Sequence, residues 1–188
     1  MTLNMNGNIN DSSYRYKMPS FQVKIGGKGN GIYTIFENID KISKSLNHPP
    51  DVILKYIASI TGSNYIAERC TITGAHTTDK LNEIIIQYIK CLVMCPMCNI
   101  PETVPTVSGT KKNVELKLKC SACNNESNIK YSNKNCEKGI DIIIKYIKAG
   151  GEWKLSKSMV SKPENSIENS IENSFDTTDD NPFNIDDI

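Results

Sequence analysis

The stretch Cys95–Cys123, CPMCNIPETVPTVSGTKKNVELKLKCSAC, contains two Cys-x-x-Cys pairs separated by 21 residues. The candidate ligands are Cys95, Cys98, Cys120 and Cys123. In each pair the backbone curls so that both sulfurs point to one spot, and two pairs complete the tetrahedral four-thiolate shell that Zn²⁺ prefers. A single pair would leave a redox dithiol or a disulfide open, but a second pair at this spacing favours structural zinc. We therefore expect these four cysteines to bind Zn²⁺.

The residues between the two pairs are suited to a β-hairpin. Glu102–Ser108 and Asn113–Lys119 are extended runs, and Gly109–Lys112 joins them with a glycine and polar residues that permit a turn. Two cysteine turns joined by a hairpin are the layout of a zinc ribbon. Four thiolates leave the metal no open position for a reacting water, so its predicted role is to stabilise the fold.

The length of 188 residues allows one medium-sized domain, a small module and a tail. The sequence contains no apolar run long enough to span a membrane and no signal-peptide pattern, which predicts a non-secreted protein without a membrane partner. Cys70, Cys91 and Cys136 remain after the four ligands are removed. We interpret them as reduced thiols, core-facing or incidental, in a reducing compartment.

Charge is divided unevenly along the chain. Residues 156–188 carry two lysines against eight acidic residues, a net charge of −6, so the total of +1 leaves +7 for residues 1–155. A basic body with an acidic tail is consistent with an RNA-containing partner, and ordinary solubility is an equally good explanation on charge alone.

Upstream of the cysteines, short alternating runs predict strands and longer apolar stripes predict helices. We expect an α+β fold: a small antiparallel sheet with packed helices, followed by a four-cysteine zinc ribbon and a disordered acidic tail. The predicted units are a flexible N-terminal arm over 1–19, an α/β domain over 20–94, the zinc ribbon over 95–133, a C-terminal helix over 134–153 and the tail over 154–188.

Two further segments have alternative interpretations. Gly26–Gly31 is rich in glycine but lacks the GxxxxGK[ST] pattern, which favours a hairpin turn over a phosphate loop. An apolar stripe over 140–147, ended by Gly150 and Gly151, predicts a helix that packs on the domain or binds a partner, and packing is the commoner outcome. Trp153 is expected to be a packing anchor.

The C-terminal tail contains two patterns. Glu164–Phe175 repeats a four-residue polar unit three times, which cannot bury a core and predicts disorder. Phe183–Ile188 instead interleaves apolar and acidic side chains up to the terminus. Such an ending can dock on a basic partner, with an inert acidic tail as the alternative.

Several motifs, in order along residues 8–150, resemble the N-terminal half of the eukaryotic translation initiation factor five family. They are YRYKMP at Tyr14–Pro19, GKGNGI at Gly27–Ile32, LNHPP at Leu46–Pro50 with Lys55-Tyr56, GAH at Gly74–His76, and CPMC at Cys95–Cys98 with Pro101-Glu102-Thr103. The beta subunit of initiation factor two looks like a relative with the same α/β-plus-ribbon architecture.

The resemblance implies a cytoplasmic protein that enters the ribosomal preinitiation complex and stimulates GTP hydrolysis by initiation factor two. It is then a GTPase-activating protein without an active site of its own. The implied partners are the gamma and beta subunits of initiation factor two, initiator tRNA, the small ribosomal subunit and mRNA, and the chain is expected to be a monomer outside this complex.

Arg15 matches the family's proposed arginine finger, and Lys55 matches a second basic position that assists activation. A contact to RNA phosphate is the alternative role for Arg15. Tyr14, Lys17 and Lys28 are the implied partner-binding residues of the body. The family's other basic position falls on Tyr33, which leaves Lys28 or Lys24 as the substitute.

The chain also departs from the family by having no room for the C-terminal helical-repeat domain. Its ending resembles the acidic and apolar C-termini of factor five and of initiation factor one A, which engage the subunit-joining GTPase, factor five B. The implied docking residues are Phe183, Ile185, Asp186, Asp187 and Ile188.

Two other functions compete with GTPase activation. The first is a non-activating module that binds the ribosome and initiator tRNA and promotes start-codon recognition. A transcription-type zinc ribbon is weaker, since a ribbon alone does not explain the α/β domain. His48 and His76 have no nucleophile or open metal site nearby in the sequence, so we expect both to be structural.

Overall fold

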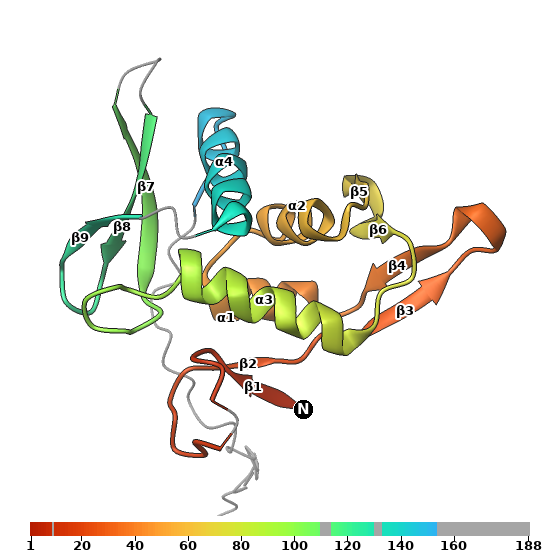
Figure 1. The fold of residues 1–188 in the computed structure, drawn as a ribbon, viewed down its shortest axis with the longest axis horizontal. Helices are drawn as coiled ribbons and strands as arrows, with labels where there is room; N and C mark the ends of the chain where they lie inside the picture. Colours follow the sequence, from red (N-terminus) through yellow and green to blue (C-terminus); the bar gives the residue numbers. More distant parts are fainter. Residues whose placement is uncertain (9, 110–113, 130–132, 154–188) are drawn as a thin grey trace, which may run out of the picture.

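The computed structural model describes residues 1–8, 10–109, 114–129 and 133–153. Within this part, four α-helices and three small antiparallel sheets make up a mixed helical and stranded body (Figure 1). The predicted combination of helices with small antiparallel sheets is therefore confirmed. The predicted tail, residues 154–188, lies outside the described residues.

The four-stranded sheet has the order β3-β4-β6-β5. Its strands are β3 (Val23–Gly26), β4 (Tyr33–Phe36), β5 (Tyr65–Ile66) and β6 (Thr71–Thr73), with 3₁₀ turns η1 (Gly29–Gly31) and η2 (Ala67–Arg69) in the connections. β3 and β4 form a hairpin that projects from the body at the far right of Figure 1. Gly27 makes its turn possible: φ is +84°, and a Cβ there would lie 2.1 Å from the Gly31 carbonyl oxygen.

Three helices pack beside this sheet. They are α1 (Ile39–Leu46), α2 (Pro50–Thr61) and α3 (Thr78–Leu92). Pro50 occupies the first turn of α2, where a missing N–H costs no hydrogen bond, and Gly62 ends that helix with φ of +70°. Asn38 precedes α1, but its side chain does not cap the helix: its Oδ1 accepts from the Gln22 N–H and its Nδ2 donates to the Ser20 carbonyl.

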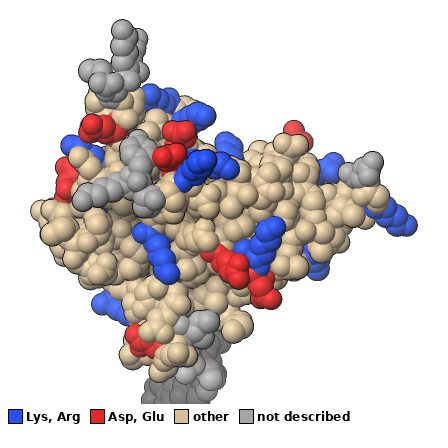
Figure 2. Space-filling view, in the orientation of Figure 1, with Lys and Arg blue, Asp and Glu red and all other residues tan. Residues whose placement is uncertain are grey.

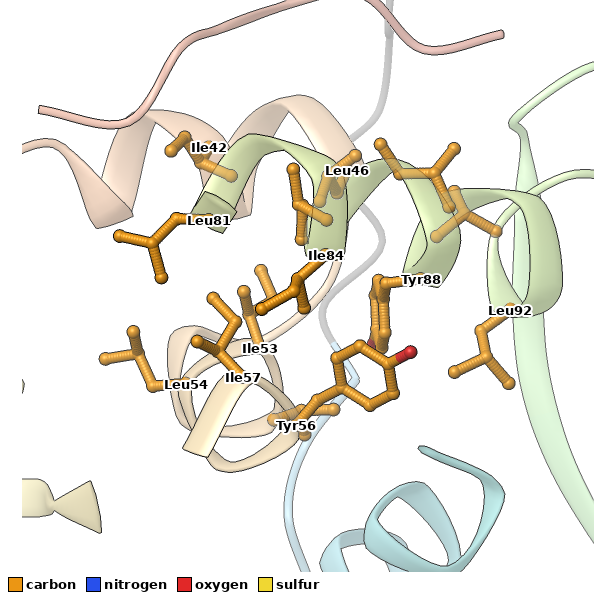
Figure 3. Close-up of a cluster of buried hydrophobic side chains, with 14 of the residues drawn as sticks. Ile42, Leu46, Ile53, Leu54, Tyr56, Ile57, Leu81, Ile84, Tyr88 and Leu92 are labelled. Carbon is orange, nitrogen blue, oxygen red and sulfur yellow. The ribbon is translucent and has the colours of Figure 1, made fainter. Parts of the chain in front are cut away.

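The hydrophobic core is built by the apolar stripes of these helices (Figure 3). The stripes follow the helical period, so each helix presents one continuous face to the others. Most of the side chains labelled in Figure 3 are fully buried: Ile42, Leu46, Ile53, Leu54, Tyr56, Ile57, Leu81, Tyr88 and Leu92. At about 1.5–3 kcal/mol for each large apolar side chain removed from water, this cluster supplies a major part of the folding free energy.

Helix α4 (Lys134–Lys148) packs against α2 and α3, the commoner of its two expected outcomes. Gly139 allows the close approach, because a Cβ there would lie 2.4 Å from a methyl of Leu92 and 3.2 Å from the Tyr56 ring. Trp153, the last described residue, stacks edge-on against His48 with ring centroids 4.6 Å apart. It is therefore the packing anchor that the sequence predicts.

The N-terminal segment differs from the expected arm, which had no partner in the core. β1 (Thr2–Asn4) pairs with β2 (Lys17–Pro19) in a separate antiparallel ladder. Met5 and Met18 are buried in the core cluster, which fixes both strands on the body. The physical reason is that β1 needs few apolar residues of its own to be held in place. Its backbone pairs with β2, and Met5 is buried in the core.

A second correction concerns the cysteines outside the four-cysteine cluster. Cys91 and Cys136, expected as reduced thiols, are joined in a disulfide with Cα atoms 5.9 Å apart. The pair is 45 residues apart in sequence and meets only because the end of α3 lies beside the start of α4. Cys70 is a free, half-buried thiol.

The third sheet follows α3 and has the order β7-β8-β9. β7 (Thr103–Gly109) and β8 (Val114–Cys120) are the two extended runs of the predicted hairpin, paired from Thr103 with Cys120 to Gly109 with Val114. β9 (Glu126–Asn128) adds a third strand that the sequence did not predict. The predicted turn lies mostly in residues 110–113, outside the described part.

Within the described residues, no helix has both the length and the apolar character needed to cross a lipid bilayer.

Candidate metal centre and arginine loop

The structure brings the four predicted ligands together at the base of the third sheet. The sulfurs of Cys95, Cys98, Cys120 and Cys123 all lie within 4.8 Å of one another. Cys95 Sγ is 3.7 Å from Cys123 Sγ, and Cys98 Sγ is 3.6 Å from Cys120 Sγ. A tetrahedron with Zn–S bonds of about 2.3 Å has edges of about 3.8 Å, so the spacing fits a four-thiolate zinc site.

The two Cys-x-x-Cys turns, which we call knuckles, have the same backbone geometry. The N–H of the first cysteine donates to the carbonyl five residues later, Cys95 to Ile100 and Cys120 to Asn125. The residue after the second cysteine is an asparagine in the left-handed region in both, with φ of 55°. Asparagine adopts that conformation more readily than other residues with a Cβ. This repeat supports a site built for one ion at a two-fold-like centre.

A metal ion held by all four cysteines would have no open position for a reacting water, so this centre is suited to stabilising the fold. All four donors are thiols, and the four together fill the coordination shell that Zn²⁺ adopts in structural sites. The cluster is compatible with a zinc ribbon, and the residues that would hold the ion are the four predicted ones.

Among the described residues, two side-chain hydrogen bonds connect this sheet to the rest of the molecule. Thr103 Oγ1 donates to the Val93 carbonyl at 2.8 Å, in a buried position just after α3. The Tyr16 hydroxyl donates to Glu102 Oε1 at 2.6 Å, from a residue 86 positions earlier in the chain. Burial and then this hydrogen bond raise the pKa of Tyr16 to about 12, so the hydroxyl keeps its proton. The N-terminal hairpin is thus tied directly to the third sheet.

Arg15 lies beside Tyr16 in the connection between β1 and β2, which we call the arginine loop (residues 5–16). The exposures alternate: Tyr14 and Tyr16 are half-buried against the core, whereas Arg15 and Lys17 are exposed. The Arg15 guanidinium lies 5.8 Å from the Tyr16 ring centroid, within reach of a cation–π contact. Among the described residues, Arg15 makes no ion pair.

The other predicted contact residues beside Arg15 differ in whether their polar groups already have hydrogen-bond partners. Lys17 Nζ donates to the Ser12 carbonyl at 2.8 Å, which closes the arginine loop on itself. The Tyr14 hydroxyl is buried and has no hydrogen-bond partner within the described residues, and burial raises its pKa. Of the predicted residues in this region, Arg15 is therefore the cation that remains available to a partner.

Lys55 and Lys28 lie on elements away from the arginine loop. Lys55 is exposed on α2, whose neighbouring positions are buried. Figure 1 shows α1 and α3 between α2 and the β1–β2 hairpin, so the structure does not bring Lys55 to Arg15. Lys28 is exposed beside η1, at the outer end of the β3–β4 hairpin.

The same hairpin carries the position where the resemblance indicates a missing cation. Tyr33 covers Gly26 from the opposite strand, where a Cβ would meet the ring at 2.8 Å. Lys24 forms an ion pair with Glu37, whereas Lys28 has no ion pair within the described residues. Of the two expected substitutes, Lys28 is the cation that is free to contact a partner.

Basic side chains do not form one continuous patch on the face seen in Figure 2. Blue side chains lie at the tip of the β3–β4 hairpin, over α4, where acidic side chains lie among them, and at separate points over the middle of this face, where one lies beside acidic side chains. The basic side chains are therefore scattered over this face rather than gathered in a single groove.

Both histidines make structural contacts, as expected. His48 is buried, its Nδ1 lies 2.6 Å from the Tyr88 hydroxyl, and burial lowers its pKa to about 3. His76 Nε2 lies 2.9 Å from Ser63 Oγ and 3.0 Å from the Thr73 carbonyl. Neither ring belongs to the group of metal-ligating side chains found within the described part of the chain.

The predicted docking residues belong to the C-terminal tail. Phe183, Ile185, Asp186, Asp187 and Ile188 all lie outside the described residues.

Two residues of this region carry no clear signal in the sequence. Glu102 holds Tyr16, but its position directly after Pro101 is the only local cue, and it does not specify a partner. Cys91 lies four residues before the first ligand, and nothing in its surroundings indicates a partner 45 residues away.

Comparison with known proteins agrees with this geometry. A family model described as a domain found in initiation factors 2B and 5 matches residues 6–126. Eukaryotic translation initiation factor 5 of Drosophila melanogaster is 35% identical over 137 residues, covering 71% of this chain and 29% of that protein. The Caenorhabditis elegans factor is 38% identical over 135 residues, covering 70% and 30%.

A plant relative shows the same partial match. The probable eukaryotic translation initiation factor 5-2 of Arabidopsis thaliana is 39% identical over 120 residues, covering 62% of this chain and 27% of that protein. The chain thus spans about 30% of the length of the curated relatives it matches and aligns with their N-terminal part. Arg15, Lys55 and the four clustered cysteines all fall inside residues 6–126, and the chain belongs to the family of translation initiation factors that share this domain.

Proposed function

We propose that this chain stimulates GTP hydrolysis by initiation factor two in the preinitiation complex and supplies Arg15 to the partner's active site. The observation that carries the proposal is the state of Arg15: it is exposed and free of ion pairs among the described residues, while Tyr14 and Tyr16 on either side are packed. A cation presented in this way is available to a partner without first breaking an ion pair.

The residue type suits the chemistry. A guanidinium is planar and always charged, and it can donate to two phosphate oxygens at once, which an ammonium cannot do. During phosphoryl transfer, negative charge spreads over the transferring group and the leaving oxygen. An arginine supplied in trans offsets that charge and contributes roughly 10³–10⁵ in rate in GTPases that use one.

The surroundings of Arg15 favour a positioned residue over a loose one. Met5 at the start of the arginine loop and Met18 just after its end are both buried, and the Tyr16 hydroxyl donates to Glu102. A side chain held near its working position loses less conformational freedom on insertion than one on a mobile arm. Lys55, on α2, would act from another side of the body as a second basic contact to the complex.

The proposed partners follow from the family and from the distribution of charge. They are the gamma and beta subunits of initiation factor two, initiator tRNA, the small ribosomal subunit and mRNA, in the cytoplasm. The proposal includes docking of the terminal segment, Phe183–Ile188, on factor five B, because its acidic and apolar residues are suited to a basic, apolar groove.

Single-turnover hydrolysis of GTP by initiation factor two in reconstituted preinitiation complexes tests the proposal. We expect Arg15→Ala to lower the stimulated rate by about 10³-fold, with Arg15→Lys restoring little of it. Arg69→Ala is the matched control, since Arg69 is the other arginine of the chain and is exposed on η2. Equal stimulation by wild type and Arg15→Ala would rule out the arginine-finger role.

A second candidate function is a binding module that occupies the site beside initiator tRNA without activating hydrolysis. The β3–β4 hairpin favours it: Ile25 is 58% exposed, Lys28 has no ion pair among the described residues, and Tyr33 replaces a cation of the family. In the same experiment, complex formation without any stimulation by the wild-type chain would support this second function. Loss of binding in Lys28→Ala, with Lys44→Ala as an exposed control, would then identify the hairpin as the contact.

A further inference from the structure

Cys91 and Cys136 form a covalent connection between α3 and α4 that the metal centre does not require. Cys91 lies in the last turn of α3, and Cys136 lies in the first turn of α4, where Asn133 caps the helix by accepting from the Cys136 N–H at 2.8 Å. Their Cα separation of 5.9 Å is in the range typical of disulfides. The two helices therefore present the sulfurs to each other without any backbone movement.

The two cysteines differ in their access to solvent. Cys136 is 1% exposed, whereas Cys91 is half-buried and lines a surface cavity of about 770 Å³ together with Met94, Pro96 and Met97. A small reagent that enters this cavity meets the Cys91 sulfur first. Cys136 is then the resolving thiol, because it is reached only through Cys91.

The topology couples this pair to the metal centre. The disulfide closes a loop that begins four residues before Cys95 and ends thirteen residues after Cys123, so all four ligand cysteines lie inside it. The metal and the disulfide thus restrain the same segment. When the metal is bound, the loop is already closed at its knuckles; when it is lost, the disulfide still joins the two ends of the segment covalently, in addition to the packing of α4 on α2 and α3.

We propose that Cys91 and Cys136 are a reversible thiol–disulfide site that slows loss of the zinc ion under oxidising conditions. The oxidant is a low-molecular-weight disulfide. The Cys91 thiolate attacks one of its sulfurs and expels a small thiolate, and the Cys136 thiolate then attacks the Cys91 sulfur and expels the second. The pair loses two electrons, the oxidant gains them, and the two thiol protons end on the two small thiols.

This arrangement reconciles a disulfide with a reducing compartment. Disulfides that occur in such compartments are usually transient and redox-sensing rather than permanent. The four ligand thiolates are protected while they are bound to the metal, so the Cys91–Cys136 pair is the first to respond. Its closure restricts the opened loop, which favours rebinding of the metal over its escape.

The test uses the full-length, zinc-loaded chain equilibrated with mixtures of reduced and oxidised glutathione. Alkylation and mass spectrometry under non-reducing conditions should recover a linked Cys91–Cys136 peptide that increases with the oxidised fraction. Zinc release to a chromophoric chelator should then be about tenfold slower in the oxidised than in the reduced wild type, the direction expected when a cross-link restricts the opened chain.

Variants separate the pair from general oxidation. Cys91→Ser and Cys136→Ser should each release zinc at one rate in both buffers, and Cys70→Ser should behave as wild type. Because Cys136 is buried, Cys91→Ser is the variant that keeps the test valid if Cys136→Ser fails to fold. The proposal is overturned if Cys91 and Cys136 stay alkylated, or carry glutathione instead of each other, at the oxidised end of the series. Equal zinc release from oxidised and reduced wild type would also overturn it.

Discussion

The three-helix core and the four-cysteine sheet lie at opposite ends of α3, and they are stabilised in different ways. The core end buries Leu81, Ile85 and Tyr88 among the side chains of α1 and α2, and its stability comes from apolar area removed from water. Past Leu92 the same chain enters a small sheet with few buried apolar side chains, among them Leu118 and Leu116, of which Leu116 packs on the core cluster. We expect metal ligation by the four cysteines to supply there what packing supplies in the core.

The difference shows that one continuous helix can join two units that are destabilised by different changes. Volume changes and buried charge act on the core, whereas loss of the ion acts on the sheet. The contacts between Tyr16 and Glu102 and between Thr103 and Val93 decide how far a failure in one unit is transmitted to the other.

Removal of the metal is expected to have the largest effect and to separate the two units. Chelation, or Cys98→Ser, should remove about 10–16 kcal/mol of apparent folding free energy from the sheet and leave the core folded. Hydrogen exchange measured by mass spectrometry should show β7, β8 and β9 losing protection while α2 retains it, with Cys70→Ser as the control. Equal loss of protection in α2 would mean that the two units are one cooperative unit.

A change of pH tests the stability of the core separately from that of the sheet. Burial holds the pKa of His48 near 3, against about 6.5 in the unfolded chain, so the unfolded state binds the extra proton between these values. The free energy of unfolding of the core should be constant above about pH 6.5 and fall by about 1.4 kcal/mol per pH unit below it. Urea unfolding at several pH values, monitored by a signal from the core, measures this change in the free energy of unfolding per pH unit.

The loss of core stability at low pH has to be distinguished from protonation of the cysteine thiolates at the metal centre. His48→Gln removes the titrating group and leaves the metal centre intact, so it should flatten the slope in the core without changing acid-induced zinc release. A slope that persists in His48→Gln would assign the acid loss to other groups and contradict the role given to His48.

The smallest expected effect concerns the junction between the arginine loop and the sheet. Tyr16→Phe removes the hydroxyl that donates to Glu102 and should lower the free energy of unfolding by about 1 kcal/mol. Tyr14→Phe is a matched control, because the Tyr14 hydroxyl is buried without a partner among the described residues, so its loss should be neutral or stabilising. Denaturant unfolding of both variants, completed by a double-mutant cycle with Glu102→Gln, gives the coupling; equal effects of the two variants would argue against it.

Local signals in the sequence predicted most of the fold. The repeated Cys-x-x-Cys spacing located the candidate metal centre because ligand number and geometry leave few alternatives, and the glycine-rich turn at Gly26–Gly31 indicated the β3–β4 hairpin. Helical stripes identified α1, α2 and α3, since each stripe needs only its own period. These features depend on residues close together in the chain.

The features that sequence reasoning missed depend on residues far apart. β1 has the sequence Thr-Leu-Asn, too short and too polar to predict a strand, and it forms because β2 lies alongside and Met5 finds the core. Likewise, Tyr16 meets Glu102 and Cys91 meets Cys136 only after α3 and α4 are in place. For this reason the structure has a packed loop where an arm was expected, and a disulfide where two separate thiols were expected.

If the four cysteines bind a metal ion as expected, the hydrogen bond between Tyr16 and Glu102 makes the arginine loop sensitive to that ion, which takes no part in the proposed reaction. Glu102 lies one residue before the strand that begins opposite Cys120, so collapse of the knuckles would release Tyr16 and with it the neighbouring Arg15. Under the proposed function, a cell starved of zinc would lose activation of the GTPase, because the hydrogen bond between Tyr16 and Glu102 that holds the arginine loop would be lost. The zinc supply of the cell would then affect the rate of start-codon selection.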